Sequence, residues 1–235
     1  MTSSFGTPPL AGSVLVTGGA SGLGAAVVDA VLAAGGKPLV VDQRPPGADV
    51  PYVIADLADS GEAERATAAL VAQAGSLTAV VTAAGIDHPG RLDQVSTEVW
   101  ERVVRVNLLG TAAVIRAALP AVERPGGRIV TVASTLGLRA VSDATAYCAA
   151  KFGVVGFTRA LAAELAGQVG VTLLIPGGMR TRFFEGRAEQ YRPPADAPLN
   201  DPADVARAVV FALTQPAGCE LRELVICPSV ESSYP

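Results

Sequence analysis

The stretch SVLVTGGASGLG, residues 13–24, decides the fold. Its apolar start has the composition of a buried strand, and glycines at positions 18, 22 and 24 lead into a helical pattern. Glycines there allow a tight turn and a close approach of the backbone to a pyrophosphate, for which the helix N-terminus supplies free N–H groups. The stretch therefore predicts a strand–turn–helix unit that binds a dinucleotide; a turn that is merely tight is the alternative.

Short apolar runs alternate with longer helical patterns along the rest of the chain. The further runs are KPLVVD (37–42), YVIAD (52–56), LTAVVTAAG (77–85), GRIVTVAS (127–134), VTLLIPGG (171–178) and LRELVICP (221–228). The helical stretches are 22–34, 60–74, 97–119, 145–167 and 202–215. This alternation predicts one α/β domain over residues 1–235, a doubly wound parallel sheet (Rossmann fold) of about seven strands with helices on both faces. A Pro-, Arg- and Gly-rich stretch at about 178–200 is expected to be a mobile flap.

Composition narrows the function classes. Half of the 235 residues are hydrophobic, 17% are charged and the net charge is −4, which argues against nucleic-acid or anionic-membrane partners. The apolar runs are short or interrupted, so we expect no membrane span, and the N-terminus lacks the pattern of a signal peptide. Three cysteines without metal-type spacing and a single histidine predict no metal site and a cytoplasmic protein.

Two further features suit a nucleotide-dependent site. Asp42 ends the second predicted strand, where a carboxylate can accept hydrogen bonds from an adenosine ribose; a turn or capping role is the alternative. Tyr147 and Lys151, in the run YCAAK, lie one turn apart on the same face of a predicted helix. A lysine on a helix is usually a solvated charge, so this pair needs support from the rest of the chain.

Together these features resemble the short-chain dehydrogenase/reductase family over nearly the whole chain. The TGxxxGxG turn is matched, as are the Asp after the third strand, the helical Asn, the Ser after the fifth strand, YxxxK, and the PG-then-Thr motif. The matching residues are Thr17, Gly18, Gly22, Gly24, Asp56, Asn107, Ser134, Tyr147, Lys151, Pro176, Gly177 and Thr181.

The resemblance implies an NAD(P)-dependent oxidoreductase that interconverts a secondary alcohol and a ketone. The implied catalytic residues are Asn107, Ser134, Tyr147 and Lys151. The implied cofactor-binding residues are Gly18, Ser21, Gly22, Leu23, Gly24, Asp42, Asp56, Leu57, Ala84, Gly85, Tyr147, Lys151, Pro176, Gly177 and Thr181. It further implies a small-molecule alcohol or ketone substrate and assembly as a homodimer or homotetramer.

The implied roles give the paired tyrosine and lysine a chemistry. A free tyrosine has a pKa of about 10, so Lys151 is expected to lower the pKa of Tyr147 and let it act as general acid or base. Ser134 would hold the substrate oxygen, and Asn107 would anchor a water that links the lysine to solvent. Lys151 would also hold the nicotinamide ribose.

The nucleotide is predicted to be NAD, with NADP as the alternative. Asp42 would repel a 2′-phosphate, and Ser21 stands before Gly22 where NADP-using relatives often carry Arg or Lys. Arg44, two residues after Asp42, is able to reverse this preference if it points toward the ribose.

Three departures from the family pattern stand out. Thr82 occupies a position where many members have an Asn that braces the sheet, so it must act through its hydroxyl or not at all. The fourteen residues from Asp42 to Asp56 leave room for a loop but not for the usual helix. The C-terminus lacks the Asp-Gly-Gly that often follows the last strand, so oligomer contacts made there in relatives are not carried over.

Several residues near the expected substrate site stay open. His88 follows the fourth strand and is either a substrate contact or a loop residue without a specific role. Trp100 is assigned to packing in the core or at a subunit interface. The flap arginines either clamp an acidic group or are solvated charges, and we expect the latter; they are Arg180, Arg182, Arg187 and Arg192.

Three other functions are compatible with parts of the pattern. A non-catalytic nucleotide-sensing regulator would be expected to lack Ser134, Tyr147 or Lys151, and all are present. A sugar-nucleotide epimerase or dehydratase usually needs more chain after the last strand. An enoyl reductase usually has a wider Tyr–Lys spacing than YxxxK.

Overall fold

Seven parallel strands form one sheet in the order β3-β2-β1-β4-β5-β6-β7, as the alternating pattern predicts. The computed structural model describes residues 9–122, 126–231 and 234. Within them the strands are β1 (Ser13–Thr17), β2 (Lys37–Asp42), β3 (Tyr52–Ile54), β4 (Ala79–Thr82), β5 (Gly127–Val132), β6 (Val169–Pro176) and β7 (Glu223–Ile226). The prediction of a doubly wound Rossmann-type sheet is confirmed.

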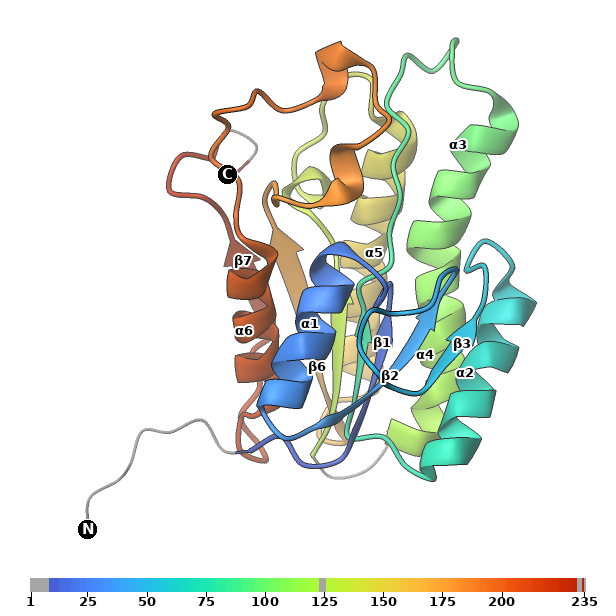
Figure 1. The fold of residues 1–235 in the computed structure, drawn as a ribbon, viewed down its shortest axis with the longest axis vertical. Coiled ribbons are helices and arrows are strands. Elements are labelled where there is room, and N and C mark those ends of the chain that lie inside the picture. Colours follow the sequence, from blue (N-terminus) through green and yellow to red (C-terminus); the bar gives the residue numbers. More distant parts are fainter. Residues whose placement is uncertain (1–8, 123–125, 232–233, 235) are drawn as a thin grey trace.

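Helices cover both faces of this sheet (Figure 1). Helices α1 (Gly22–Ala33) and α6 (Pro202–Leu213) pack on one face, and α2 (Ser60–Ala74), α4 (Gly110–Val122) and α5 (Thr145–Glu164) on the other. Each face of the sheet has its own hydrophobic core, and successive residues of β1 pack into one core and then the other, because strand side chains alternate between faces. Leu15 belongs to the core under α2 and α4, and Val16 to the core under α1 and α6.

The helix predicted over 97–119 has three parts. It begins as α3 (Thr97–Val104), continues as the π-helical turn η1 (Arg105–Leu109) and ends as α4. The whole run Thr97–Val122 is long and apolar enough to cross a membrane by length and composition alone, a longer apolar segment than the short and interrupted runs of the sequence predict. Half of its most apolar window is buried inside the protein, as in the core helix of a globular fold.

The connections at the carboxyl ends of the strands create the space for a ligand. The chain leaves β1 toward β2 and leaves β4 toward β5, in opposite directions along the sheet, and such a switch point opens a crevice between the two loops. Residues 43–51 connect β2 to β3 without a helix, as the short spacing requires. Residues 178–200 carry the short 3₁₀ helices η3 (Arg182–Phe184) and η4 (Glu189–Tyr191) and lie above this end of the sheet, in orange in Figure 1.

Candidate active site

A cavity of about 770 Å³ lies at the carboxyl ends of the strands and contains most of the predicted site. It extends from the turn after β1, past the ends of β2 and β4, to α5 and the segment after β6. The predicted residues that line it are Gly18, Ser21, Gly22, Leu23, Asp42, Leu57, Ala84, Gly85, Ser134, Tyr147, Lys151, Pro176, Gly177 and Thr181. Gly24, Asp56 and Asn107 lie outside its lining.

The turn after β1 has the shape that a pyrophosphate requires. Gly18 has φ +74°, and a Cβ there would lie 2.8 Å from Ala84 Cα, so a side chain is excluded. Gly22 has φ +55°, and Ser21 caps α1 without a side-chain hydrogen bond. The start of α1 therefore presents backbone N–H groups toward the cavity, which suits an anion.

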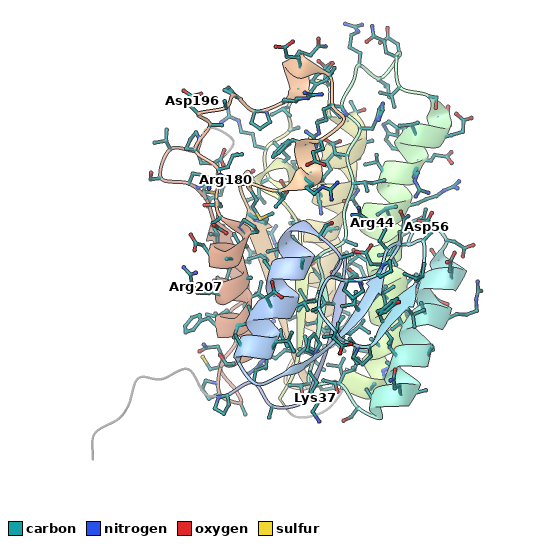
Figure 2. The ribbon with its side chains drawn as sticks, viewed as in Figure 1. Lys37, Arg44, Asp56, Arg180, Asp196 and Arg207 are labelled. Carbon is teal, nitrogen blue, oxygen red and sulfur yellow. The ribbon has the colours of Figure 1, made fainter. Side chains whose placement is uncertain are left out.

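Asp42 and Arg44 form the edge of the cavity at the end of β2. Asp42 Oδ2 accepts a hydrogen bond from Ala20 N and Oδ1 accepts one from Arg44 N, each at 3.0 Å. Arg44 Nη2 lies 3.4 Å from Ser21 Oγ, so the guanidinium faces the turn after β1. Figure 2 shows Arg44 at the opposite end of the sheet from Lys37, where β2 begins.

Asp56 and Gly24 contribute to the surroundings of the cavity. The Asp56 carboxylate lies 2.9 Å from Arg102 Nη2 and accepts a hydrogen bond from Ala58 N at 2.9 Å. Burial raises its pKa, but these partners together hold the pKa below the usual value. Its neighbour Leu57 reaches the cavity instead. Gly24 lets α1 pack directly on the backbone carbonyl of Gly18.

Asn107 stands inside the π-helical turn η1, a distortion that often marks a functional site. Its Nδ2 donates to Ile86 O at 2.7 Å and to Val103 O at 2.8 Å. Its Oδ1 is buried and has no hydrogen-bond partner among the described residues. A Cβ on Gly85 would lie 2.8 Å from Asn107 Oδ1 and 3.6 Å from Lys151 Nζ, so both polar atoms face the same glycine.

Ser134, Tyr147 and Lys151 meet where β5 and α5 approach each other. The Ser134 and Tyr147 hydroxyls are hydrogen-bonded to each other, and Ser134 Oγ accepts from Leu136 N at 3.2 Å. Lys151 Nζ donates to Val132 O at 2.9 Å and lies 5.5 Å from the centre of the Tyr147 ring. Tyr147 is 9% and Lys151 4% exposed, so the lysine is not a solvated charge.

Lys151 is expected to lower the pKa of Tyr147, but in the protein without a nucleotide the net pKa of this phenol is raised. Burial raises the pKa of Tyr147 above its ordinary value of 10, and the hydrogen bond with Ser134 opposes this only in part. Burial also lowers the pKa of Lys151 to about 8. The lysine points its ammonium at the carbonyl of Val132.

The structure gives the surroundings of three further residues whose roles the sequence did not decide. Thr82 does not brace the sheet, because its Oγ1 is buried without a partner among the described residues, whereas Thr17 Oγ1 accepts from Ala84 N at 3.1 Å. His88 is exposed. Trp100 Nε1 donates to Thr145 Oγ1 at 3.1 Å, so it braces the start of α5.

Sequence reasoning missed an ion pair in the cavity. Arg187, expected to be a solvated charge, lies 3.0 Å from Asp87 with both side chains buried. Phe183 packs beside Tyr147 with ring centres 5.7 Å apart. Asp87 follows β4 in the same loop as His88, so its place at the carboxyl end of a strand could have identified it as a site residue. No local pattern distinguishes Arg187 from the other flap arginines.

Comparison with known proteins identifies the family of the chain. Residues 13–192 match the family model for short chain dehydrogenases. The chain is 32% identical to 2,5-dichloro-2,5-cyclohexadiene-1,4-diol dehydrogenase from Sphingobium indicum, over 88% of this chain and 91% of that one. It is 34% identical to D-threitol dehydrogenase from Mycolicibacterium smegmatis, over 66% and 64%.

A solved structure shows the same architecture. A single-substitution variant of actinorhodin polyketide ketoreductase, in complex with NADPH, superposes with a TM-score of 0.82 and 29% identity, over 93% of this chain and 96% of that one. The chain belongs to the short-chain dehydrogenase/reductase family and is an oxidoreductase that acts on alcohols with a nicotinamide cofactor.

Proposed function

We propose that the protein is an NAD(H)-preferring dehydrogenase of secondary alcohols, with Tyr147 as its general acid and base. One observation carries the proposal: the cavity that begins at the glycine turn of α1 ends at Ser134, Tyr147 and Lys151. A nucleotide held along it would place its nicotinamide beside the tyrosine.

The residues of the cavity fit a dinucleotide. The glycine turn leaves no Cβ where a pyrophosphate would approach, and the free N–H groups of α1 face that position. We propose that Leu57, Ala84 and Gly85 border the adenosine half. Pro176, Gly177 and Thr181 follow β6 and would border the nicotinamide half.

The bound nicotinamide would accept or supply the hydride, and the protein would handle the proton. The Ser134 and Tyr147 hydroxyls are hydrogen-bonded to each other, so both would reach the point where a substrate oxygen would sit. Tyr147 would then take the proton of an alcohol or return it to a carbonyl oxygen. Because its pKa is raised in the protein alone, the positive charge of an oxidised nicotinamide is needed to favour the phenolate.

We propose that the proton leaves through Lys151 and Asn107. The lysine, with its pKa of about 8, can exchange protons near neutral pH. Asn107 Oδ1, which lacks a partner among the described residues, would accept a hydrogen bond from a water between it and the lysine.

Asp42 favours NAD over NADP in this proposal. Its carboxylate stands at the end of β2 and would accept hydrogen bonds from a free 2′-hydroxyl, whereas a 2′-phosphate would meet a like charge. Arg44 opposes the preference, because its guanidinium turns toward Ser21 at the same edge of the cavity.

We further propose a cytoplasmic homodimer or homotetramer without nucleic-acid, membrane or metal partners. Leu109 on η1 and Phe152 on α5 are large apolar side chains that are 47% and 44% exposed, which suits a subunit interface. The described residues contain no group of three or more side chains that could hold a metal. Light scattering on the purified protein measures the subunit number.

A hydride-transfer assay tests the central proposal. Formation of NADH is followed by its absorbance with a panel of secondary alcohols, for the wild type and for Tyr147→Phe. The proposal expects turnover that the variant loses while it still binds NADH. Equal turnover by both proteins would refute the assignment of Tyr147.

A further inference from the structure

Asp87 and Arg187 form a buried ion pair in the wall of the cavity. Arg187 Nη2 lies 3.0 Å from Asp87 Oδ2, and the two side chains are only 11% and 6% exposed. In each of the other ion pairs among the described residues, at least one side chain is 45% exposed or more. The pair joins the loop after β4 to the segment after β6, so the fold brings it together from distant parts of the chain.

The pair leaves hydrogen-bonding capacity unused. Asp87 Oδ1 and Arg187 Nε are buried and make no hydrogen bond with the residues that the structure describes. A buried acceptor and a buried donor without partners are costly, so such atoms usually meet a ligand or a water. Both residues line the cavity, where a substrate would satisfy them.

Aromatic side chains connect the pair to Tyr147. The guanidinium carbon of Arg187 is 4.7 Å from the centre of the Phe183 ring and 4.8 Å from that of Phe184. Phe183 in turn packs against Tyr147, with ring centres 5.7 Å apart. The contacts with the two phenylalanine rings hold the arginine in place. Only the ring of Phe183 separates the Arg187 guanidinium from the ring of Tyr147.

The charges of the pair favour a neutral partner. A carboxylate or phosphate would meet the anionic Asp87, and an ammonium would meet Arg187. A hydroxyl can both donate and accept, so it can donate a hydrogen bond to Asp87 Oδ1 and accept one from Arg187 Nε. Water shares this chemistry, but a substrate hydroxyl gains the same bonds together with orientation at the tyrosine.

We infer that the substrate is a neutral diol or polyol, or the corresponding hydroxyketone, whose second hydroxyl binds between Asp87 and Arg187. The inference rests on the proposed function, because it names the substrate class of that site. One hydroxyl reacts at Tyr147, and the other is recognised by the ion pair.

Matched alcohols with and without a second hydroxyl test the inference. The probes are cyclohexanol and its 1,2-, 1,3- and 1,4-diols, with butan-2-ol and 3-hydroxybutyrate as a neutral and anionic pair. For the wild type we expect kcat/KM for at least one diol to exceed that for cyclohexanol about tenfold or more, as a hydrogen bond to a charged group provides. We expect no comparable gain for 3-hydroxybutyrate over butan-2-ol.

Asp87→Asn keeps the shape of the side chain and removes its charge. We expect it to abolish most of the diol preference, measured as the ratio of kcat/KM for the diol to kcat/KM for cyclohexanol in the same variant. We also expect the ratio of kcat/KM for 3-hydroxybutyrate to that for butan-2-ol to rise, because Arg187 is then uncompensated. Arg187→Gln should also lose the diol preference. Asp93→Asn and Arg180→Gln, both exposed on the same two segments, are the matched controls and should retain it.

Ligand-observed NMR of the same alcohols, on the protein with NADH, gives a readout that does not depend on turnover. Equal kcat/KM for cyclohexanol and all the diols, or an equal loss for every alcohol in Asp87→Asn, would overturn the inference and leave the proposed function intact. Diol binding that requires Asp87 without hydride transfer to NAD⁺ or NADP⁺ would support the inference and refute the proposed function. Absence of both binding and turnover for every diol would overturn the inference.

Discussion

Replacing Asp42 with asparagine should reduce the preference of the protein for NADH over NADPH. The asparagine keeps the size of the side chain, but its single amide oxygen can accept from only one of Ala20 N and Arg44 N, which the two carboxylate oxygens of Asp42 each accept at 3.0 Å. It removes the negative charge that a 2′-phosphate would meet. The loss of one hydrogen bond affects both nucleotides, so the ratio of the NADH and NADPH dissociation constants reports the loss of charge.

The magnitude follows from the position of the carboxylate. Two unit charges about 4 Å apart interact by roughly 4 kcal/mol at an effective dielectric constant of about 20. Asp42 is partly exposed and Arg44 is exposed beside it, so solvent and the guanidinium screen much of this repulsion. We expect about 1–2 kcal/mol to remain, so that Asp42→Asn tightens NADPH binding roughly tenfold.

Dissociation constants from titration calorimetry, at one fixed salt concentration, measure the effect. NADH should bind the wild type more tightly than NADPH. The factor by which Asp42→Asn weakens NADH binding should be smaller than the factor by which it strengthens NADPH binding. The reverse order in the wild type, or a ratio of the two constants that Asp42→Asn leaves unchanged, would refute the reasoning.

Arg44→Gln is the counterpart experiment. Its guanidinium faces Ser21, where a 2′-phosphate would lie close to it. Removing the charge should weaken NADPH binding more than NADH binding and widen the wild-type preference. A uniform loss for both nucleotides would instead place Arg44 on the pyrophosphate, which both nucleotides share.

Three further predictions concern catalysis and the segment above the cavity. Tyr147→Phe should lower kcat by about 10²–10⁴-fold with little change in the NADH dissociation constant, since the ring still packs while the proton donor is lost; wild-type turnover would contradict this. Ser134→Ala removes a hydrogen bond that lowers the pKa of Tyr147, so the pH at which the rate of alcohol oxidation rises should become higher. A pH–rate profile that stays in place or moves to lower pH would count against the role of Ser134. Residues 178–200 should gain protection from hydrogen exchange when NAD and a substrate analogue bind; protection that does not change would exclude a lid.

The fold was predictable because it depends on local patterns. Each strand is a short apolar run between turn residues, and each helix has the periodicity of one buried face. The helix over 97–119 shows the limit of such patterns. Its π-helical turn at Arg105–Leu109 contains Asn107, which donates to Val103 O in the preceding turn and to Ile86 O in the loop after β4.

The protonation states of the catalytic pair were not predictable from their spacing. Four residues along a helix place Tyr147 and Lys151 on one face, but spacing says nothing about burial. In the structure both side chains are almost fully buried and the lysine donates to Val132 O. Desolvation therefore raises the pKa of Tyr147 although the spacing places a lysine nearby.

The two halves of the cavity differ in what positions them. The nucleotide half is set by the ends of parallel strands, and short motifs in the sequence mark those ends. The substrate half is closed by Arg187, which reaches Asp87 across one hundred residues of sequence and is held between Phe183 and Phe184. No periodicity or spacing encodes that contact. A change in the segment after β6 can thus alter which alcohol is recognised without touching the strands that hold the nucleotide, which is why motifs predict the chemistry of this protein and only the assembled cavity points to its substrate.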